Sequence, residues 1–207
     1  MIILEMLSYS FLARAMLVGV LVSLCSALLG TSLVLKRYSM IGDGLSHVGF
    51  GALAVASALG LAPLAVAVPV VVVAAVVLLR ISQTRSAIKG DAAVALISSG
   101  ALAIGVLVIS LTSGVNTNVS NYMFGSILTV SRADAVLSVV LCAAVILCFT
   151  LLYPRIFAVT FDETFAKATG ARAGAYNTLL AVLTAVTVVL GMRMMGALLI
   201  SSLIIFP

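Results

Sequence analysis

Charged side chains are scarce in this chain. Asp, Glu, Lys and Arg together make up 8% of its 207 residues, against about 25% in a typical soluble domain. There is no Trp and only one His, whereas hydrophobic residues account for 64% of the chain. Several apolar runs are long enough to cross a bilayer, which takes about 20 helical residues at about 1.5 Å each. These properties exclude an ordinary soluble domain and predict an all-α, polytopic helical membrane protein.

Cysteine, histidine and glutamate are also few, and the scarcity of each argues against a class of protein or of site. The cysteines, Cys25, Cys142 and Cys148, all lie in apolar runs, which predicts small buried hydrophobes rather than disulfide partners or metal ligands. A single His, with glutamate only at positions 5 and 163, argues against an intramembrane metalloenzyme, which needs more ligands and a general base. The net charge of +5 requires no nucleic-acid partner, because the basic residues cluster at the ends of apolar runs.

The apolar runs predict one transmembrane domain over residues 1–207, with six complete spans and a seventh segment that begins at Met194–Pro207. The second run is short for a straight crossing, and a start near Ser39 would place Asp43 inside the membrane. The predicted spans are Leu12–Leu35, Gly44–Leu59, Pro63–Leu79, Ala92–Leu111, Ala133–Leu152 and Ala175–Met192.

Basic residues predict the orientation of these spans. Placing Lys36 and Arg37 in the cytoplasm puts eight of the eleven Lys and Arg residues inside and three outside. The positive-inside rule favours this arrangement over its reverse. It gives an external N-terminus, an external loop at Thr112–Asn121 and a cytoplasmic loop at Tyr153–Gly174. The eight are Lys36, Arg37, Arg80, Arg85, Lys89, Arg155, Lys167 and Arg172, and the three are Arg14, Arg132 and Arg193.

The segment MIGDGLSHVGF (Met40–Phe50) contains the only histidine, His47, four residues after Asp43. Helical residues four apart share a face, with Cβ atoms about 5–6 Å apart, so both side chains can reach one Zn²⁺, Mn²⁺ or Fe²⁺ ion. An ionisable residue in the hydrocarbon layer costs about 2.5–3.5 kcal/mol on insertion scales, which favours a functional role. Two ligands cannot complete a site, but a symmetric dimer would bring two pairs together. In the alternative interpretation Asp43 caps the helix at the membrane interface and His47 binds a backbone carbonyl.

The cytoplasmic loop contains a pattern typical of a short surface helix. Pro154 is expected to end the preceding span. In FDETFAKATG, Asp162 is a suitable N-cap, Glu163 lies in the first turn, Lys167 lies in the last turn and Gly170 is the expected C-cap.

The segment LVLKRYSMIGDGLSHVGFGALA (Leu33–Ala54) resembles the signature of the ZnuB-like family of zinc, manganese and iron ABC transporter permeases. Later segments resemble the family in the same order, so the similarity covers nearly the whole chain. These segments are FGSILTVSRAD (Phe124–Asp134), FDETFAKATG (Phe161–Gly170) and MGALLISSLIIFP (Met195–Pro207).

The resemblance implies a type II-like ABC importer transmembrane domain in the bacterial cytoplasmic membrane. Family members pair with a second permease subunit and move the ion between the two subunits, without a permanently bound cofactor. Cytoplasmic ATPase subunits hydrolyse ATP, and an extracellular or periplasmic binding protein delivers the metal. The chain has no G-x-x-x-x-G-K-[ST] motif, so it is not the ATP-hydrolysing subunit. The resemblance assigns metal coordination to Asp43 and His47, and ATPase coupling to Phe161, Asp162, Glu163, Phe165, Lys167 and Gly170.

Two expectations qualify this interpretation. Family members continue beyond the segment that ends at Pro207, so we expect this chain to lack C-terminal spans of the family. The competing function is an ion-coupled secondary metal transporter that acts without an ATPase. Such carriers usually contain internal repeats and more than one charged intramembrane site, and we find neither pattern in the sequence.

Overall fold

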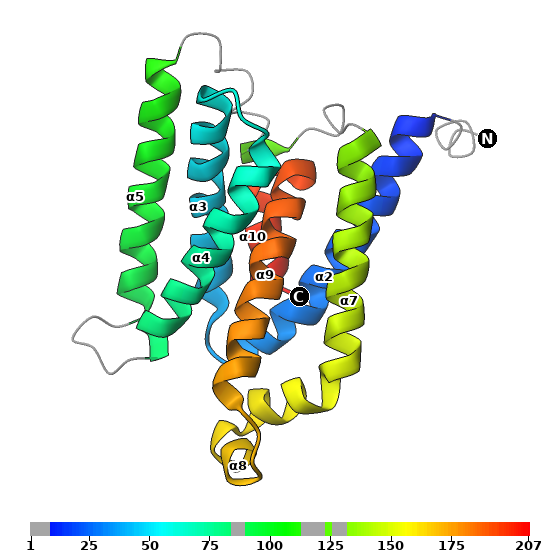
Figure 1. Ribbon diagram of the computed structural model, residues 1–207, viewed down its shortest axis with the longest axis vertical. Helices are drawn as coiled ribbons and strands as arrows, with labels where there is room; N and C mark the ends of the chain where they lie inside the picture. The colour runs from blue at the N-terminus through cyan, green and yellow to red at the C-terminus, as the bar shows by residue number, and fades with distance from the viewer. Residues whose placement is uncertain (1–8, 84–89, 113–122, 126–131) are drawn as a thin grey trace.

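The computed structural model describes residues 9–83, 90–112, 123–125 and 132–207, and the elements labelled in Figure 1 are all α-helices. In chain order they are α2 (Ser10–Leu35), α3 (Ser39–Ala58), α4 (Pro63–Gln83), α5 (Gly90–Leu111), α7 (Arg132–Phe161), α8 (Glu163–Ala168), α9 (Ala173–Met195) and α10 (Ala197–Ile205).

Five of these helices, α2, α4, α5, α7 and α9, are long and apolar enough to cross a membrane. They correspond to five of the six predicted spans and confirm the polytopic helical fold. The remaining predicted span is α3, which is less apolar because it carries Asp43, His47 and several glycines. It begins at Ser39 rather than Gly44, so Asp43 lies within the helix.

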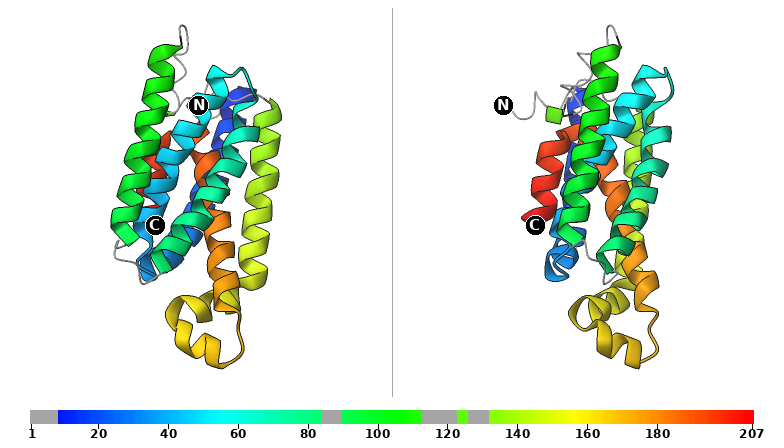
Figure 2. Two further views of the ribbon diagram at one scale, coloured as in Figure 1. Left: turned by 60° about the vertical axis from the view of Figure 1, so that its left-hand side comes forward. Right: turned by 90° about the vertical axis from the view of Figure 1, so that its left-hand side faces the viewer.

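The helices form two groups joined by α9 and α10. On one side α3 packs against both α4 and α5, and on the other side α2 packs against α7. Helix α9 contacts α2, α3, α4 and α7, while α10 contacts α2, α3 and α9. Figures 1 and 2 show α9 in the middle of the bundle, and it is the most buried of the five apolar helices, with 67% of its apolar stretch buried inside the protein. The core therefore lies along α3 and α9.

Small residues allow α3 to approach its neighbours closely. A Cβ atom added to Gly51 would lie only 2.7 Å from the carbonyl oxygen of Ala101 on α5. A Cβ added to Gly49 would lie 2.9 Å from the Met192 side chain on α9. Close approach at glycine is a common packing device of membrane helices, where apolar side chains gain little by leaving lipid.

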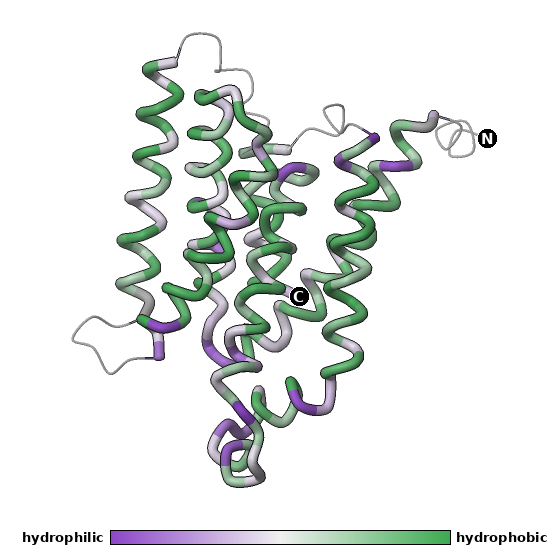
Figure 3. The backbone as a smooth tube through the Cα atoms, in the orientation of Figure 1, coloured by the Kyte–Doolittle hydropathy of each residue, from purple (hydrophilic) through white to green (hydrophobic). Residues whose placement is uncertain are grey.

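Hydrophilic residues gather at the two ends of the bundle, with apolar residues along its length (Figure 3). One end, called here the α8 end, carries Lys36 and α8. At the opposite end Arg193 on α9 forms an ion pair with Asp134 on α7, with an N–O distance of 2.7 Å. Lys36 and Lys167 thus lie at one end of the bundle and Arg193 at the other. The distribution predicted from the sequence places them on opposite sides of the membrane in the same way. Residues 85 and 89 of that prediction, and most of the predicted 112–121 loop, lie outside the described residues.

The expectation that Pro154 ends a helix is wrong. Helix α7 continues through Pro154 to Phe161, and its final part, yellow in Figure 1, runs across the direction of the rest. Proline lacks a backbone N–H and its ring crowds the carbonyl four residues earlier, so it can bend a helix without ending it. Contacts between aromatic rings four residues apart continue through the bend, with Tyr153 next to both Phe149 and Phe157. The bend carries the end of α7 to α8.

Candidate functional site: an Asp–His pair on α3 and a polar cluster at α8

Asp43 does not cap α3. The N-cap is Tyr38, whose side chain makes no capping hydrogen bond, and Asp43 is the fifth residue of the helix. A capping carboxylate accepts from backbone N–H groups in the first turn that follows it, whereas Asp43 lies more than one turn inside. The capping interpretation of Asp43 is therefore wrong.

Asp43 and His47 form the open part of an otherwise enclosed stretch of helix. Between Ile41 and Ala54, a stretch described throughout, they are the two residues that are not buried. The exposed fraction is 36% for the Asp43 side chain and 22% for the His47 side chain. Neighbouring glycines bring other helices against the remaining faces of α3, so these faces are closed. The two polar side chains thus share the face of α3 that a second molecule or an ion can reach.

The geometry of the pair suits a shared ion. His47 Nε2 and Asp43 Oδ2 are 3.7 Å apart, which is too long for a hydrogen bond between them. Ligand atoms bound at about 2.0–2.2 Å from one ion can be up to roughly 4.3 Å apart. Both atoms can therefore bind one divalent transition-metal ion.

The other nitrogen of His47, Nδ1, is buried and has no hydrogen-bond partner within the described part of the chain. This contradicts the interpretation in which that nitrogen is satisfied by a backbone carbonyl. The nearby Ser46 hydroxyl does not serve it either, since it donates to the carbonyl of Asp43 at 2.7 Å. The Nε2 atom of the imidazole faces the Asp43 carboxylate.

The described residues contain no cluster of three or more His, Cys, Asp and Glu side chains that could hold a metal ion. Asp43 and His47 therefore stand as a pair without a third such side chain beside them in the described part of the chain, and their role as metal ligands stays a prediction. The three cysteines are free, and Cys25 and Cys142 are buried in the helix packing.

The predicted short helix is present as α8, at the far end of the bundle (Figure 1). Asp162 is its N-cap and accepts a hydrogen bond from the backbone N–H of Phe165 at 2.8 Å. The predicted C-cap needs a correction, because Thr169 is the C-cap and Gly170 follows it with a φ of 84°. A left-handed residue just after the helix favours glycine, since a Cβ atom would be strained there.

One face of α8 is fixed and another is open. Ala166 is buried against Val159 at the end of α7 and Ala173 at the start of α9. Phe161 and Phe165 are each 63% exposed. Of the predicted coupling residues, these two aromatic side chains therefore offer the apolar surface at this end.

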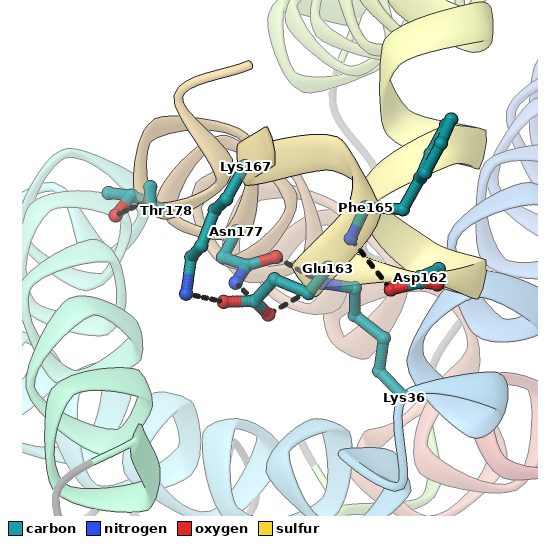
Figure 4. A network of polar contacts seen from close by, with 8 residues as sticks. Lys36, Asp162, Glu163, Phe165, Lys167, Asn177 and Thr178 are labelled. Carbon is teal, nitrogen blue, oxygen red and sulfur yellow. Dashed lines mark hydrogen bonds and ion pairs between the residues drawn. The ribbon is translucent and has the colours of Figure 1, made fainter. Parts of the chain in front are cut away.

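A polar cluster that was not predicted from the sequence ties α8 to the bundle (Figure 4). Glu163 Oε1 pairs with Lys167 Nζ at 2.7 Å, and Glu163 Oε2 accepts from Asn177 Nδ2 at 3.1 Å and lies 3.7 Å from Lys36 Nζ. Lys36 also donates to the side-chain oxygen of Asn177. Asn177 is 2% exposed near the start of the apolar helix α9. A lone Asn in an apolar run was the available signal, but its partners lie 14 and 141 residues away.

The charges of this cluster influence one another. The hydrogen bond from Lys167 holds the pKa of Glu163 below its ordinary value, with further lowering by Asn177 and by the charge of Lys36. Burial lowers the pKa of Lys36, and the nearby Glu163 carboxylate opposes this effect. Lys36 is thus a largely desolvated cation that relies on Glu163 for its charge compensation.

Comparison with known proteins identifies the family. The model of the ABC 3 transport family matches residues 8–207. The chain belongs to the ABC 3 transport family. This confirms the resemblance found in the sequence, and the helical bundle is accordingly the transmembrane domain of an ABC transporter.

Named relatives in the ABC 3 family include transport proteins for metals. The chain is 28% identical to the manganese transport system membrane protein MntC of Halalkalibacterium halodurans, over 98% of this chain and 69% of the relative. It is 30% identical to a probable metal transport system membrane protein of Thermotoga maritima, over 98% of this chain and 71% of the relative.

A solved structure of the same fold supports the assignment. PsaBC from Streptococcus pneumoniae in complex with Fab aligns with a TM-score of 0.85 and 28% identity. The alignment covers 98% of this chain and 73% of the other. The fold is thus that of an ABC importer membrane domain, and this member of the ABC 3 family spans about 70% of the length of such relatives.

Proposed function

We propose that the chain is the permease subunit of an ATP-driven importer of divalent transition-metal ions, with manganese as the first candidate substrate and zinc and iron as further ones. The named relatives support a metal substrate, and MntC supports manganese. Carboxylate oxygens suit Mn²⁺ and imidazole suits zinc and iron, so the Asp43–His47 pair is compatible with all three.

The observation that carries the proposal is the shared open face of Asp43 and His47 on a helix that is otherwise buried from Ile41 to Ala54. Two ligands from one chain do not complete the coordination of a transition-metal ion. In the proposed transporter, a second permease subunit adds its own pair, and the ion passes between the subunits. A bound cation would also offset the cost of placing a carboxylate at membrane depth.

The coupling function is assigned to the α8 end. A cytoplasmic ATPase subunit hydrolyses ATP and docks on Phe161, Asp162, Glu163, Phe165, Lys167 and Gly170. The exposed rings of Phe161 and Phe165 and the capped helix between them support this role. A metal-binding protein delivers the ion at the opposite end, which faces outward in the bacterial cytoplasmic membrane.

Reconstituted vesicles test the proposal. The full-length permease, its ATPase and ⁵⁴Mn²⁺ are combined with ATP, with a non-hydrolysable analogue or without nucleotide. We expect uptake with ATP only, and competition by Zn²⁺ or Fe²⁺ ranks the metals. Uptake that is independent of ATP and follows an ion gradient would instead identify a secondary carrier and overturn the proposal.

A further inference from the structure

Lys36 lies at the corner between α2 and α3. It is the C-cap of α2, and Arg37 follows with a left-handed φ of 61°. The backbone N–H of Tyr38 then bonds the carbonyl of Leu33 at 2.8 Å, and α3 begins at Ser39. The connection is therefore short and hydrogen-bonded, and a force on Lys36 acts directly on the first turn of α3.

The Lys36 side chain points into the protein rather than into solvent. It is 6% exposed, donates to the side-chain oxygen of Asn177 on α9 and pairs with Glu163 of α8. Within the described residues, Glu163 is the carboxylate with which Lys36 forms an ion pair. Removing one partner of a desolvated ion pair costs far more than removing one partner at the surface. The structure thus favours states in which Lys36 and Glu163 stay together.

Glu163 connects three helices through one carboxylate. It belongs to α8, it accepts from Asn177 of α9 and it faces Lys36 at the end of α2 (Figure 4). The buried contact of Ala166 with Val159 and Ala173 fixes α8 to α7 and α9, but provides no contact with α3. The polar cluster therefore adds a direct side-chain contact from α8 to the corner before Asp43, beside the packing of α9 against α2 and α3.

We propose that Lys36, Asn177 and Glu163 form a mechanical link through which movement of α8 shifts the start of α3. This shift changes the position of the Asp43 and His47 side chains. The link rests on the proposed function, since it presumes an ATPase that moves α8. Asp43 lies in the second turn of α3, and the helix between the corner and the pair is continuous. A displacement of the corner is therefore passed on to the ligands.

Two substitutions outside α8 break the link. Lys36→Met removes the contacts of Lys36 with Asn177 and Glu163, and Asn177→Leu removes the contacts of Asn177 with Lys36 and Glu163. Both leave every residue of α8 and both ligands unchanged, so docking of the ATPase and binding of metal are preserved. Lys36→Met removes one partner of the ion pair, but the Glu163 carboxylate that remains is 37% exposed and still has Lys167, so no buried charge is left unpaired and the variant is expected to fold. Glu163 keeps its pair with Lys167 in both variants.

The matched control is Tyr176→Phe, next to Asn177 in the chain. It removes the hydrogen bond between the Tyr176 hydroxyl and Arg155, whose length is 2.9 Å, at the same end of the bundle. This contact joins α9 to α7 and does not involve the corner before α3, so we expect coupling to stay at the wild-type level.

The experiment measures three quantities on the full-length permease–ATPase complex: bound Mn²⁺, ATP hydrolysis and ⁵⁴Mn²⁺ uptake per ATP hydrolysed. Lys36→Met and Asn177→Leu should bind Mn²⁺ and hydrolyse ATP, while uptake per ATP falls about 5–150-fold, the usual range of coupling between two sites. Unchanged uptake per ATP in Lys36→Met overturns the link. Failure of both variants to assemble also overturns it, since the cluster then serves folding only. A wild-type complex without ATP-dependent uptake overturns the proposed function itself.

Discussion

Two side chains on α3 differ from their neighbours in being accessible. Asp43 and His47 are half-buried where the surrounding residues are fully enclosed. Their atoms Oδ2 and Nε2 stand at a separation that one metal ion can bridge. At the scale of the residue, the charge of Asp43 is therefore the property to test.

Asp43→Asn should reduce Mn²⁺ uptake by about 10–100-fold or more, since even outer-shell groups of metal sites have effects of this size. Asn keeps the size of Asp and one accepting oxygen but lacks the negative charge. Met40→Leu is the matched control, because Met40 is an exposed residue less than one turn earlier. Uptake of ⁵⁴Mn²⁺ into vesicles measures both variants. Normal uptake by a well-expressed Asp43→Asn permease would contradict the metal-site interpretation.

Glu163 gives a prediction for pH. Its hydrogen bond with Lys167 holds its pKa below the ordinary value of 4.5. A carboxyl group whose pKa is lowered by folding stabilises the protein above that ordinary value, and the contribution is lost as the pH falls through the lowered value. Wild type should therefore have a higher Tm than Glu163→Gln at neutral pH, and the difference should begin to shrink below pH 4.5 and vanish only below the lowered pKa. A difference that persists at the lowest pH would contradict this assignment.

At the scale of the element, glycine sets how closely α3 and α5 approach. Gly51→Ala should lower the stability by about 1–3 kcal/mol, the usual cost of overpacking, because the added Cβ would lie 2.7 Å from the carbonyl oxygen of Ala101. Gly100→Ala on α5 is the control, since nothing lies within 4 Å of its added Cβ. It should be neutral or stabilise by up to about 1 kcal/mol through helix propensity. Thermal unfolding in detergent compares the two, and equal effects would contradict the packing argument.

Helix α8 has only six residues and depends on its cap. Asp162→Ala should cost about 0.5–2 kcal/mol because the N–H of Phe165 loses its acceptor, whereas Asp162→Asn should keep most of the cap. Hydrogen exchange of the α8 amides measures this, with faster exchange expected in Asp162→Ala alone. Equal protection in both variants would show that α8 is held by Ala166 rather than by its cap.

Elements were predictable from the sequence where one local property decides them. A helix in lipid must be apolar over its whole length, so α2, α4, α5, α7 and α9 were all found. The cap of α8 was found because Asp162 acts on a residue three positions later. Pro154 was misjudged, because whether proline ends or only bends a helix depends on the contacts of the residues that follow.

The features of the site were likewise predictable only where they depend on residues close together in the sequence. Asp43 and His47 share a helical face through their spacing, which the sequence displays. Their accessibility depends on the packing of α4, α5, α9 and α10 around α3, which no local pattern reveals. The link between Lys36 and Asn177 was missed for the same reason, since the two residues meet only after α2 and α9 have packed together.

At the scale of the whole molecule, the two polar ends have different chemistry. Lys36 and Lys167 share the carboxylate of Glu163 at the α8 end. Arg193 pairs with Asp134 at the opposite end, where Arg14 and Arg132 line an apolar groove between α2 and α7 with a volume of about 500 Å³. The larger share of Lys and Arg belongs to the α8 end, so the positive-inside rule predicts that this end lies in the cytoplasm.

Cysteine labelling tests this orientation with residues at the two ends. Leu61, in the turn between α3 and α4, is 51% exposed, and the Lys167 side chain on α8 is 61% exposed. In intact cells, Leu61→Cys should react with a membrane-impermeant thiol reagent and Lys167→Cys should not, whereas permeabilised cells should label both. The parent chain is the control, because Cys25 and Cys142 are buried and Cys148 is half-buried in α7. Labelling of Lys167→Cys but not Leu61→Cys in intact cells would reverse the topology, and would place α8 where no cytoplasmic ATPase can reach it.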